Sequence, residues 1–294
     1  MSSPALLGAF VGDATALGAH WIYERAEIAK KFSDAAGLHA PATTYHPGKK
    51  AGDFTHLGDQ MWILLMSMQA KDNRFEPADF MRRWTAFWKT PGNPSYPDKA
   101  TRQTLAAIDG GASPLDAGTD SEELAGPARG MVALALGIGQ NLTLDELVGM
   151  SKTQTRLTHR SALADDTALF LARLMFSLGR GRELSAALDE SLAGTGARTQ
   201  ALAKKATATE VSSLSTGDAI EALGQSCSLS AALPATVLLL HRHGHSFAEA
   251  IRENVNAGGD SAARGIVIGG VLGLVHGTDA IPAAWRTGLC RMPV

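Results

Sequence analysis

The sequence is poor in cysteine and in charged residues. Its 294 residues include two cysteines, Cys227 and Cys290, and neither belongs to a CxxC or CxxH pattern. This spacing argues against a disulfide framework and a zinc ribbon, and it favours a reducing, cytoplasmic location. Charged residues make up 19% of the chain, and the formal net charge is -2. We therefore expect no binding to nucleic acid and none to an anionic membrane.

The sequence also lacks a long apolar run. Asp13 interrupts the apolar N-terminal stretch "ALLGAFVGDATALG", and no basic segment precedes that stretch. The run from Gly265 to Val275 spans 11 residues, whereas a membrane-spanning helix needs about 20. We expect neither a signal peptide nor a membrane span.

Alternation of β-branched residues over four or more positions is nearly absent, and a helical period takes its place. Apolar residues recur at helical spacing over 59–70, 78–89, 130–140, 144–154, 166–179, 229–243, 246–256 and the run after Asp260. Thr143 and Ser246 each begin an S/T-x-x-E capping box at a helix start. We predict an all-α fold, a compact single-domain helical bundle of roughly a dozen helices over residues 1–294.

Glycine recurs every fourth residue in the last long helical stretch, at Gly265, Gly269, Gly273 and Gly277, and Gly8 and Gly12 repeat the spacing near the N-terminus. On a helix this spacing makes a narrow face that lets another helix approach closely. Each glycine costs a helix interior about 1 kcal/mol relative to alanine, so a packing gain must exceed that cost. We predict that these two helices lie at the centre of the fold and bring their neighbouring loops together.

Two polar clusters stand in the N-terminal part of the chain. Burial of Asp13 in its apolar helix would need partners or a metal ion, and the alternative is a partly exposed side chain bonded to nearby backbone. The loop "AGDFTHLGDQ" supplies Asp53, Thr55, His56 and Asp59. Asp59 is either the N-cap of the following helix or part of a site for a hard cation such as Mg²⁺.

Two further polar clusters come later in the chain. Asp165 and Asp166 precede a long apolar helix, where the helix dipole favours a capping role over metal ligation. The glycines of "GGDS", residues 258–261, allow close backbone approach to a ligand, and the free N–H groups of the next helix favour anions. Asp260 or Ser261 could equally be a simple helix cap.

Taken in order, these clusters resemble the ADP-ribosylglycohydrolase family, whose best-known members remove ADP-ribose from arginine. "LLGAFVGDATALG" is similar to the family's opening Gly-x-x-x-Gly-Asp-x-x-Gly helix, and "GDQMWILLMSM" stands where the family has Thr-Asp-Asp-Thr-Gln-Met. "GPARGMVALALG" and "TRLTHRSALADDTALFLARL" resemble its Gly-x-Ala-Met-Arg and Thr-His segments. The most specific likeness is the order "AI…N-x-GGD…G…G-x-x-x-G…IP-x-x-W" in the last third of the chain.

The resemblance implies an all-α fold with two Mg²⁺ ions between the Asp-rich helix start and the Gly-Gly-Asp loop, and ADP-ribose over them. A metal-bound water and a carboxylate then act on the N- or O-glycosidic bond at C1″. The resemblance implies catalytic and metal-binding roles for Asp59 and Asp260. It places in the ligand pocket Asp13, His56, Gly58, Gly126, Arg129, His159, Asn256, Gly258, Gly259, Ser261 and Arg264.

The sequence departs from the family pattern at the metal ligands. With Gln-Met in register, the stretch 56–59 leaves one carboxylate, Asp59, and Ala262 replaces the second aspartate of the last loop. A Mg²⁺ site needs about six oxygen ligands, so we expect one ion at most. Arg264 could neutralise Asp260 and Asp59 in place of a metal, contact a pyrophosphate, or lie exposed on its helix.

Two functions of different classes remain open from the sequence. The first is hydrolysis of an N- or O-glycosidic bond of ADP-ribose attached to a protein or a small molecule. The second is a non-catalytic role, either binding ADP-ribose or a nucleotide or serving as a structural protein, as the lens crystallins of the family do. The replaced metal ligands favour the second function, and the retained pocket loops favour the first.

Overall fold

Helices make up the regular structure of the chain. A computed structural model describes residues 3–293, and the β pairing within them is limited to two isolated bridges, Thr119–His159 and Glu123–Ser228. The all-α prediction is therefore confirmed. The helices of the first half are α1 (Pro4–Ala16), α2 (Arg25–Lys31), α3 (His56–Gln69), α4 (Pro77–Trp88), α5 (Lys99–Asp109), α6 (Ala125–Arg129), α7 (Met131–Gly139) and α8 (Leu144–Arg156). Those of the second half are α9 (Ala162–Gly179), α10 (Leu184–Ala193), α11 (Ala197–Lys204), η1 (Lys205–Thr207), α12 (Thr209–Ser212), α13 (Thr216–Leu223), α14 (Leu229–His243), α15 (Phe247–Asn256), α16 (Ser261–His276), η2 (Thr278–Ala280) and α17 (Ala283–Thr287).

The long helices agree with their sequence signals. α4, α8 and α14 match the expected ranges closely, and the capping box of α8 forms: Glu146 donates its N–H to the Thr143 hydroxyl at 3.3 Å, and its carboxylate accepts the Thr143 N–H at 2.8 Å. The helices beyond the expected dozen include α6, α12 and α17, which have four or five residues. Such lengths are too short to carry a helical period.

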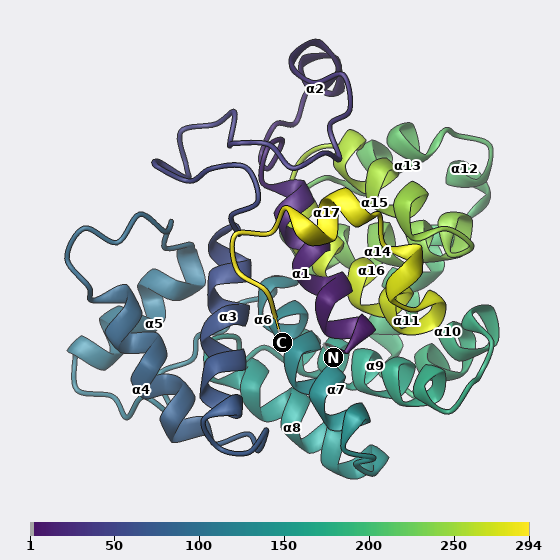
Figure 1. Ribbon diagram of the computed structural model, residues 1–294. Helices are drawn as coiled ribbons and strands as arrows, with labels where there is room; N and C mark the ends of the chain where they lie inside the picture. Colours follow the sequence, from purple (N-terminus) through teal and green to yellow (C-terminus); the bar gives the residue numbers. More distant parts are fainter. Residues whose placement is uncertain (1–2, 294) are drawn as a thin grey trace.

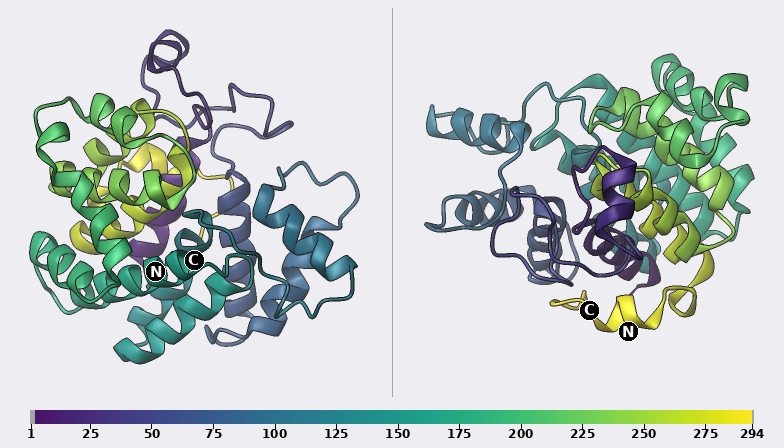
Figure 2. Two further views of the ribbon diagram at one scale, coloured as in Figure 1. Left: turned by 180° about the vertical axis from the view of Figure 1, so that it is seen from behind. Right: turned by 90° about the horizontal axis from the view of Figure 1, so that it is seen from above.

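α1 and α16 lie side by side in the middle of the molecule (Figures 1 and 2). A Cβ atom added at Gly8 would lie 2.1 Å from the Gly269 carbonyl oxygen, and one at Gly12 would lie 2.0 Å from that of Gly265. The two backbones therefore touch, and the predicted central pair of glycine-faced helices is confirmed. Gly277 differs from the other glycines of the repeat because it ends α16 with a φ of 78°.

The other helices surround this central pair. α3, α4 and α5 lie on one side of α1, and α10 to α13 lie on the other, as both figures show. α2 and the two loops that flank it rise beyond the end of α1 (Figure 1). These loops lie at the same end of the central pair as the start of α16.

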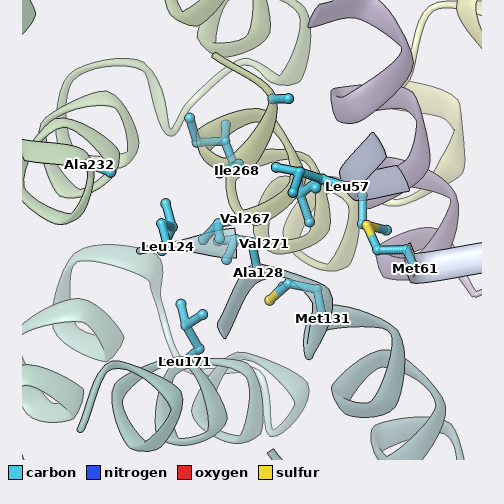
Figure 3. Close-up of a cluster of buried hydrophobic side chains, with 14 of the residues drawn as sticks. Leu57, Met61, Leu124, Ala128, Met131, Leu171, Ala232, Val267, Ile268 and Val271 are labelled. Carbon is cyan, nitrogen blue, oxygen red and sulfur yellow. The ribbon is translucent and has the colours of Figure 1, made fainter. Parts of the chain in front are cut away.

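Apolar side chains from many helices meet on α16. Leu57 and Met61 of α3, Met131 of α7 and Leu171 of α9 are at most 3% exposed. Figure 3 shows them converging on Val267 and its neighbours. This packing fixes α16, and with it the loop that begins the helix. Among the described residues, no helix is both long enough and apolar enough to cross a membrane.

Candidate functional site

The loop that leads into α16 is built from two glycines in a left-handed conformation. Gly258 and Gly259 have φ values of 74° and 69°. A Cβ atom at Gly258 would lie 2.7 Å from the Ile22 carbonyl oxygen, and one at Gly259 would lie 2.3 Å from that of Gln225. Both positions require glycine because the backbone conformation and the close neighbours exclude a side chain.

Backbone hydrogen bonds tie this loop to two other segments. Gly259 donates its N–H to the Ile22 carbonyl at 2.8 Å and accepts the Trp21 N–H at 3.0 Å. Asp260 donates its N–H to the Gln225 carbonyl at 2.8 Å. The loop between α1 and α2 and the loop after α13 thus hold Asp260 in place.

Asp260 is the N-cap residue of α16, yet its side chain makes no capping hydrogen bond. The carboxylate is 3% exposed, and its Oδ1 has no hydrogen-bond partner and lies 3.8 Å from His20 Nδ1. Burial raises the pKa of Asp260 to about 6, Arg264 opposes that rise, and the carboxylates of Glu123 and Asp98 add to it. A carboxylate with this pKa is mostly ionised at pH 7 and can still accept a proton, as a general base requires.

Arg264 is fully buried, which excludes the alternative of an exposed helical arginine. Its Nε donates to Asn254 Oδ1 at 2.9 Å, and its Nη2 donates to the Gly258 carbonyl at 2.6 Å. Burial lowers the pKa of Arg264 to about 10, and Asp260 opposes that fall. Arg264 therefore braces the glycine loop from behind and adds a positive charge beside Asp260.

The sequence pointed to Asn256 as a pocket residue, but it is Asn254, two residues earlier, that braces the glycine loop. Asn254 is fully buried and donates from Nδ2 to the Ser261 carbonyl at 2.8 Å, in addition to accepting from Arg264. Asn256 is exposed at the end of α15. Ser261 is buried, and its hydroxyl has no hydrogen-bond partner.

Three buried histidines form a cluster, and one of them, His20, lies 3.8 Å from Asp260 Oδ1. His20 and His46 come from the loops on either side of α2, and His56 is the first residue of α3. Their ring nitrogens offer one ligand atom each within 4.8 Å of one another. Burial lowers the pKa of all three, that of His46 to about 2, so the imidazoles are neutral and their lone pairs are available. This cluster could hold a metal ion. Sequence reasoning singled out His56 and missed the other two, because nothing in their local sequence marks them.

Aromatic rings cover the histidines. Trp21 stacks on His20 with ring centroids 4.4 Å apart, and it holds an uncommon positive φ of 65°. Tyr45 and Tyr96 pack edge-on against Trp21 at 4.8 Å and 5.0 Å. Tyr45 is 44% exposed, so the aromatic wall reaches from the buried histidines to the surface. Such a wall can stack on a base or on the apolar face of a sugar.

Asp13 is fully buried, and its carboxylate accepts hydrogen bonds from three donors. Its carboxylate accepts the Thr55 N–H at 2.8 Å, the Thr55 hydroxyl at 2.5 Å and the Gly58 N–H at 3.2 Å. Burial raises the pKa of Asp13 to about 7, and the bonds from Thr55 lower it. Gly58 leaves room for this carboxylate, because a Cβ atom there would lie 2.1 Å from Asp13 Oδ2. Asp13 therefore joins α1 to the start of α3.

Asp59 lies in the first turn of α3, and the N-cap is Thr55, so the capping interpretation of Asp59 is wrong. Its carboxylate is 5% exposed and forms ion pairs with Lys49 and, at 2.6 Å, with Arg291. Ser95 adds a hydrogen bond of 2.8 Å. Two cations already neutralise this carboxylate, so Asp59 and Asp260 do not fit a Mg²⁺ site that needs oxygen ligands from both.

Three further residues that the sequence placed in the ligand pocket are His159, Gly126 and Arg129. His159 is buried, with Nε2 3.8 Å from a Glu123 carboxylate oxygen, and Gly126 leaves space for the His159 ring, which a Cβ atom would approach to 2.7 Å. Arg129 is buried and donates from Nη2 to the Gln154 carbonyl at 2.6 Å, so its role here is structural.

Asp165 and Asp166 have partners outside this centre. α9 begins at Ala162, so both aspartates lie inside the helix rather than before it, and its N-cap is Ser161. Asp165 pairs with Arg156 of α8, and Asp166 accepts the Gly196 N–H at 2.8 Å. The structure therefore does not bring these two carboxylates to Asp260.

Comparisons with known proteins agree with this architecture. The sequence profile of the ADP-ribosylglycohydrolase family matches residues 4–292. A solved structure described as an "ADP-ribosylglycohydrolase-related protein complex" superposes with a TM-score of 0.73 at 22% identity, covering 98% of this chain and 92% of that one. No curated protein matches the chain.

Proposed function

The chain belongs to the ADP-ribosylglycohydrolase family, and from this premise we propose that it hydrolyses a glycosidic bond of ADP-ribose attached to a protein or a small molecule. One observation carries the proposal: the buried Asp260 carboxylate has an oxygen without a partner, next to the histidines and the aromatic wall. A buried acceptor without a donor is costly unless a ligand or water supplies one. The two free cysteines fit a reducing compartment such as the cytoplasm.

In this proposal Asp260 orients the attacking water, accepts its proton as the water oxygen bonds to C1″, and returns that proton to the departing nitrogen or oxygen. The C1″–N or C1″–O bond of the ribose breaks through a transition state with oxocarbenium character. Asp260 and Glu123 supply negative charge near that developing cation, and the pKa of Asp260, about 6, suits proton transfer near neutral pH. Trp21 and Tyr96 stack on the ligand and exclude bulk water. Mg²⁺, for which the sequence allowed one ion at most, takes no part, because Lys49 and Arg291 occupy the Asp59 carboxylate.

A second candidate function is binding of ADP-ribose or a nucleotide without catalysis. The ion pairs of Asp59 favour it, because a carboxylate neutralised by two cations cannot also hold a metal ion that activates water. The aromatic wall and the braced glycine loop would serve a binding protein equally well.

Release of free ADP-ribose from arginine-linked, serine-linked and acetyl-linked ADP-ribose tests the proposal. We expect turnover of at least one of these substrates, and we expect Asp260→Asn to lower kcat by at least about 100-fold, the range for loss of a general base. Asp166→Asn is the matched control, since that carboxylate bonds to Gly196 outside the centre. Full activity of Asp260→Asn would contradict the proposal, and binding of ADP-ribose without turnover of any substrate would favour the second function.

A further inference from the structure

We propose that His20, His46 and His56 bind one divalent transition-metal ion of the zinc type, in place of the Mg²⁺ ions that oxygen ligands would hold. The geometry of the three histidines supports this site whether or not the protein hydrolyses ADP-ribose.

Several nitrogen atoms of these imidazoles are buried without a hydrogen-bond partner. Both ring nitrogens of His20 and Nδ1 of His46 are buried without a hydrogen-bond partner, as is Oδ1 of Asp260. Buried polar atoms in folded proteins almost always have a partner, so a group of four orphaned atoms in one place needs a reason. A cation among them would be a partner for one nitrogen of His20 and would also satisfy Oδ1 of Asp260, while His46 would bind through Nε2.

The spacing of the nitrogens suits a shared ion. His46 Nε2 lies 3.3 Å from His56 Nδ1, which is long for a hydrogen bond between two rings. Two nitrogens bound to one tetrahedral ion at about 2.05 Å lie about 3.3 Å apart. The third ligand atom, from His20, is within 4.8 Å of both. To share a tetrahedral ion it must lie about 3.3 Å from each of the other two nitrogens, a shift of up to about 1.5 Å that rotation of the His20 ring would have to supply.

The surroundings resemble the outer shell of a metal site. His56 Nε2 lies 3.6 Å from Asp98 Oδ2, and the other oxygen of Asp98 accepts the Thr101 N–H at 2.7 Å. A fixed carboxylate on the far nitrogen orients a histidine toward a metal. The stacked ring of Trp21 restrains His20 in the same way.

The donor set indicates the class of metal. Imidazole suits zinc, copper, iron and nickel, whereas Mg²⁺ requires oxygen ligands. Three histidines with a fourth position open, next to the free oxygen of Asp260, match the ligand number of catalytic zinc sites. The carboxylates of Asp260, Asp98 and Glu123 balance the charge of such an ion.

The test is a zinc titration of tag-free, chelator-treated protein against a chromogenic competitor. We expect one Zn²⁺ per chain, no displacement by a large excess of Mg²⁺, and an affinity lowered by more than about 100-fold in His46→Gln, beyond the loss typical of an outer-shell change. His245→Gln is the matched control, because that exposed histidine pairs with Glu249 away from the cluster. We expect this variant to bind Zn²⁺ like the wild type.

A second measurement covers the case in which His46→Gln fails to fold. Co²⁺ added to the wild-type protein should give the visible d–d absorption of a four- or five-coordinate ion, and Zn²⁺ should abolish it. The inference would be overturned if these bands were absent, if His46→Gln bound zinc as tightly as the wild type, or if the protein preferred Mg²⁺. A crystal structure of the zinc-treated protein with only ordered water at the three rings would also overturn it. Metal binding is measured without substrate, so a chain that binds zinc but hydrolyses nothing would contradict only the proposed function.

Discussion

Replacement of Gly269 by alanine tests the central contact between α1 and α16. The added methyl group would lie 2.1 Å from the Gly8 carbonyl oxygen, about 1.3 Å short of the 3.4 Å at which ordinary contact begins. The obstacle is backbone, so it cannot turn aside as a side chain could. The two helices must therefore separate along their length.

The size of the effect follows from two opposing contributions. Alanine in place of glycine inside a helix contributes about 1 kcal/mol of stability. Overpacking costs about 1–3 kcal/mol and occasionally more. We expect the upper end of this range, because a gap of about 0.5–1 Å opened between the two helices also forfeits part of their dispersion energy. The net expectation is a loss of about 2 kcal/mol in the free energy of unfolding.

Urea unfolding, followed by circular dichroism, measures this loss. Gly149→Ala is the matched control, because Gly149 lies in the middle of α8 and a Cβ atom there meets nothing within 4 Å. We expect the control to gain about 0.5–1 kcal/mol. A Gly269→Ala variant as stable as the wild type, or stabilised like the control, would refute the close backbone contact.

Two further predictions concern single side chains. Burial would raise the pKa of Asp79, but hydrogen bonds from Arg82, Arg83 and Ser67 hold it well below its usual range. A lowered carboxyl pKa contributes stability above the unfolded value of about 4 that is lost as the pH falls. Asp79→Asn should therefore cost about 1–2 kcal/mol at pH 7 and progressively less below pH 4 in urea unfolding, and a constant difference would contradict this. Asn254→Ala should cost about 2–3 kcal/mol, because the Nε of Arg264 loses its acceptor and the Ser261 carbonyl loses its donor. Asn256→Ala should change the unfolding free energy by less than about 0.5 kcal/mol, and equal effects would count against the bracing role.

The fold was predictable because its signals are local. The apolar period of α4 or α14 and the capping box at Thr143 act within a few residues of chain, and the structure reproduces them. The contact of α1 with α16 was also predictable, although it is distant in sequence, because glycine at every fourth position has few explanations other than close helix packing.

The site was predictable only in part because tertiary packing assembles it. The Gly-Gly-Asp loop carries its own signal, but His20 and His46 lie in irregular loops and meet His56 only when the chain folds. Asp59 illustrates the opposite failure: its sequence position suggested a ligand, yet Lys49 in the preceding loop and Arg291 near the other end of the chain neutralise it. Sequence spacing does not report such partners.

The most direct test of the account is a crystal structure of the chain soaked with ADP-ribose. We predict that the ligand lies against Asp260 and Trp21, with its distal ribose toward the three histidines. A competing site is the cavity of about 500 Å³ near α9 lined by Arg173, Arg180 and Arg182, whose guanidinium groups could attract a pyrophosphate. ADP-ribose bound in that cavity, with none at Asp260, would contradict the account.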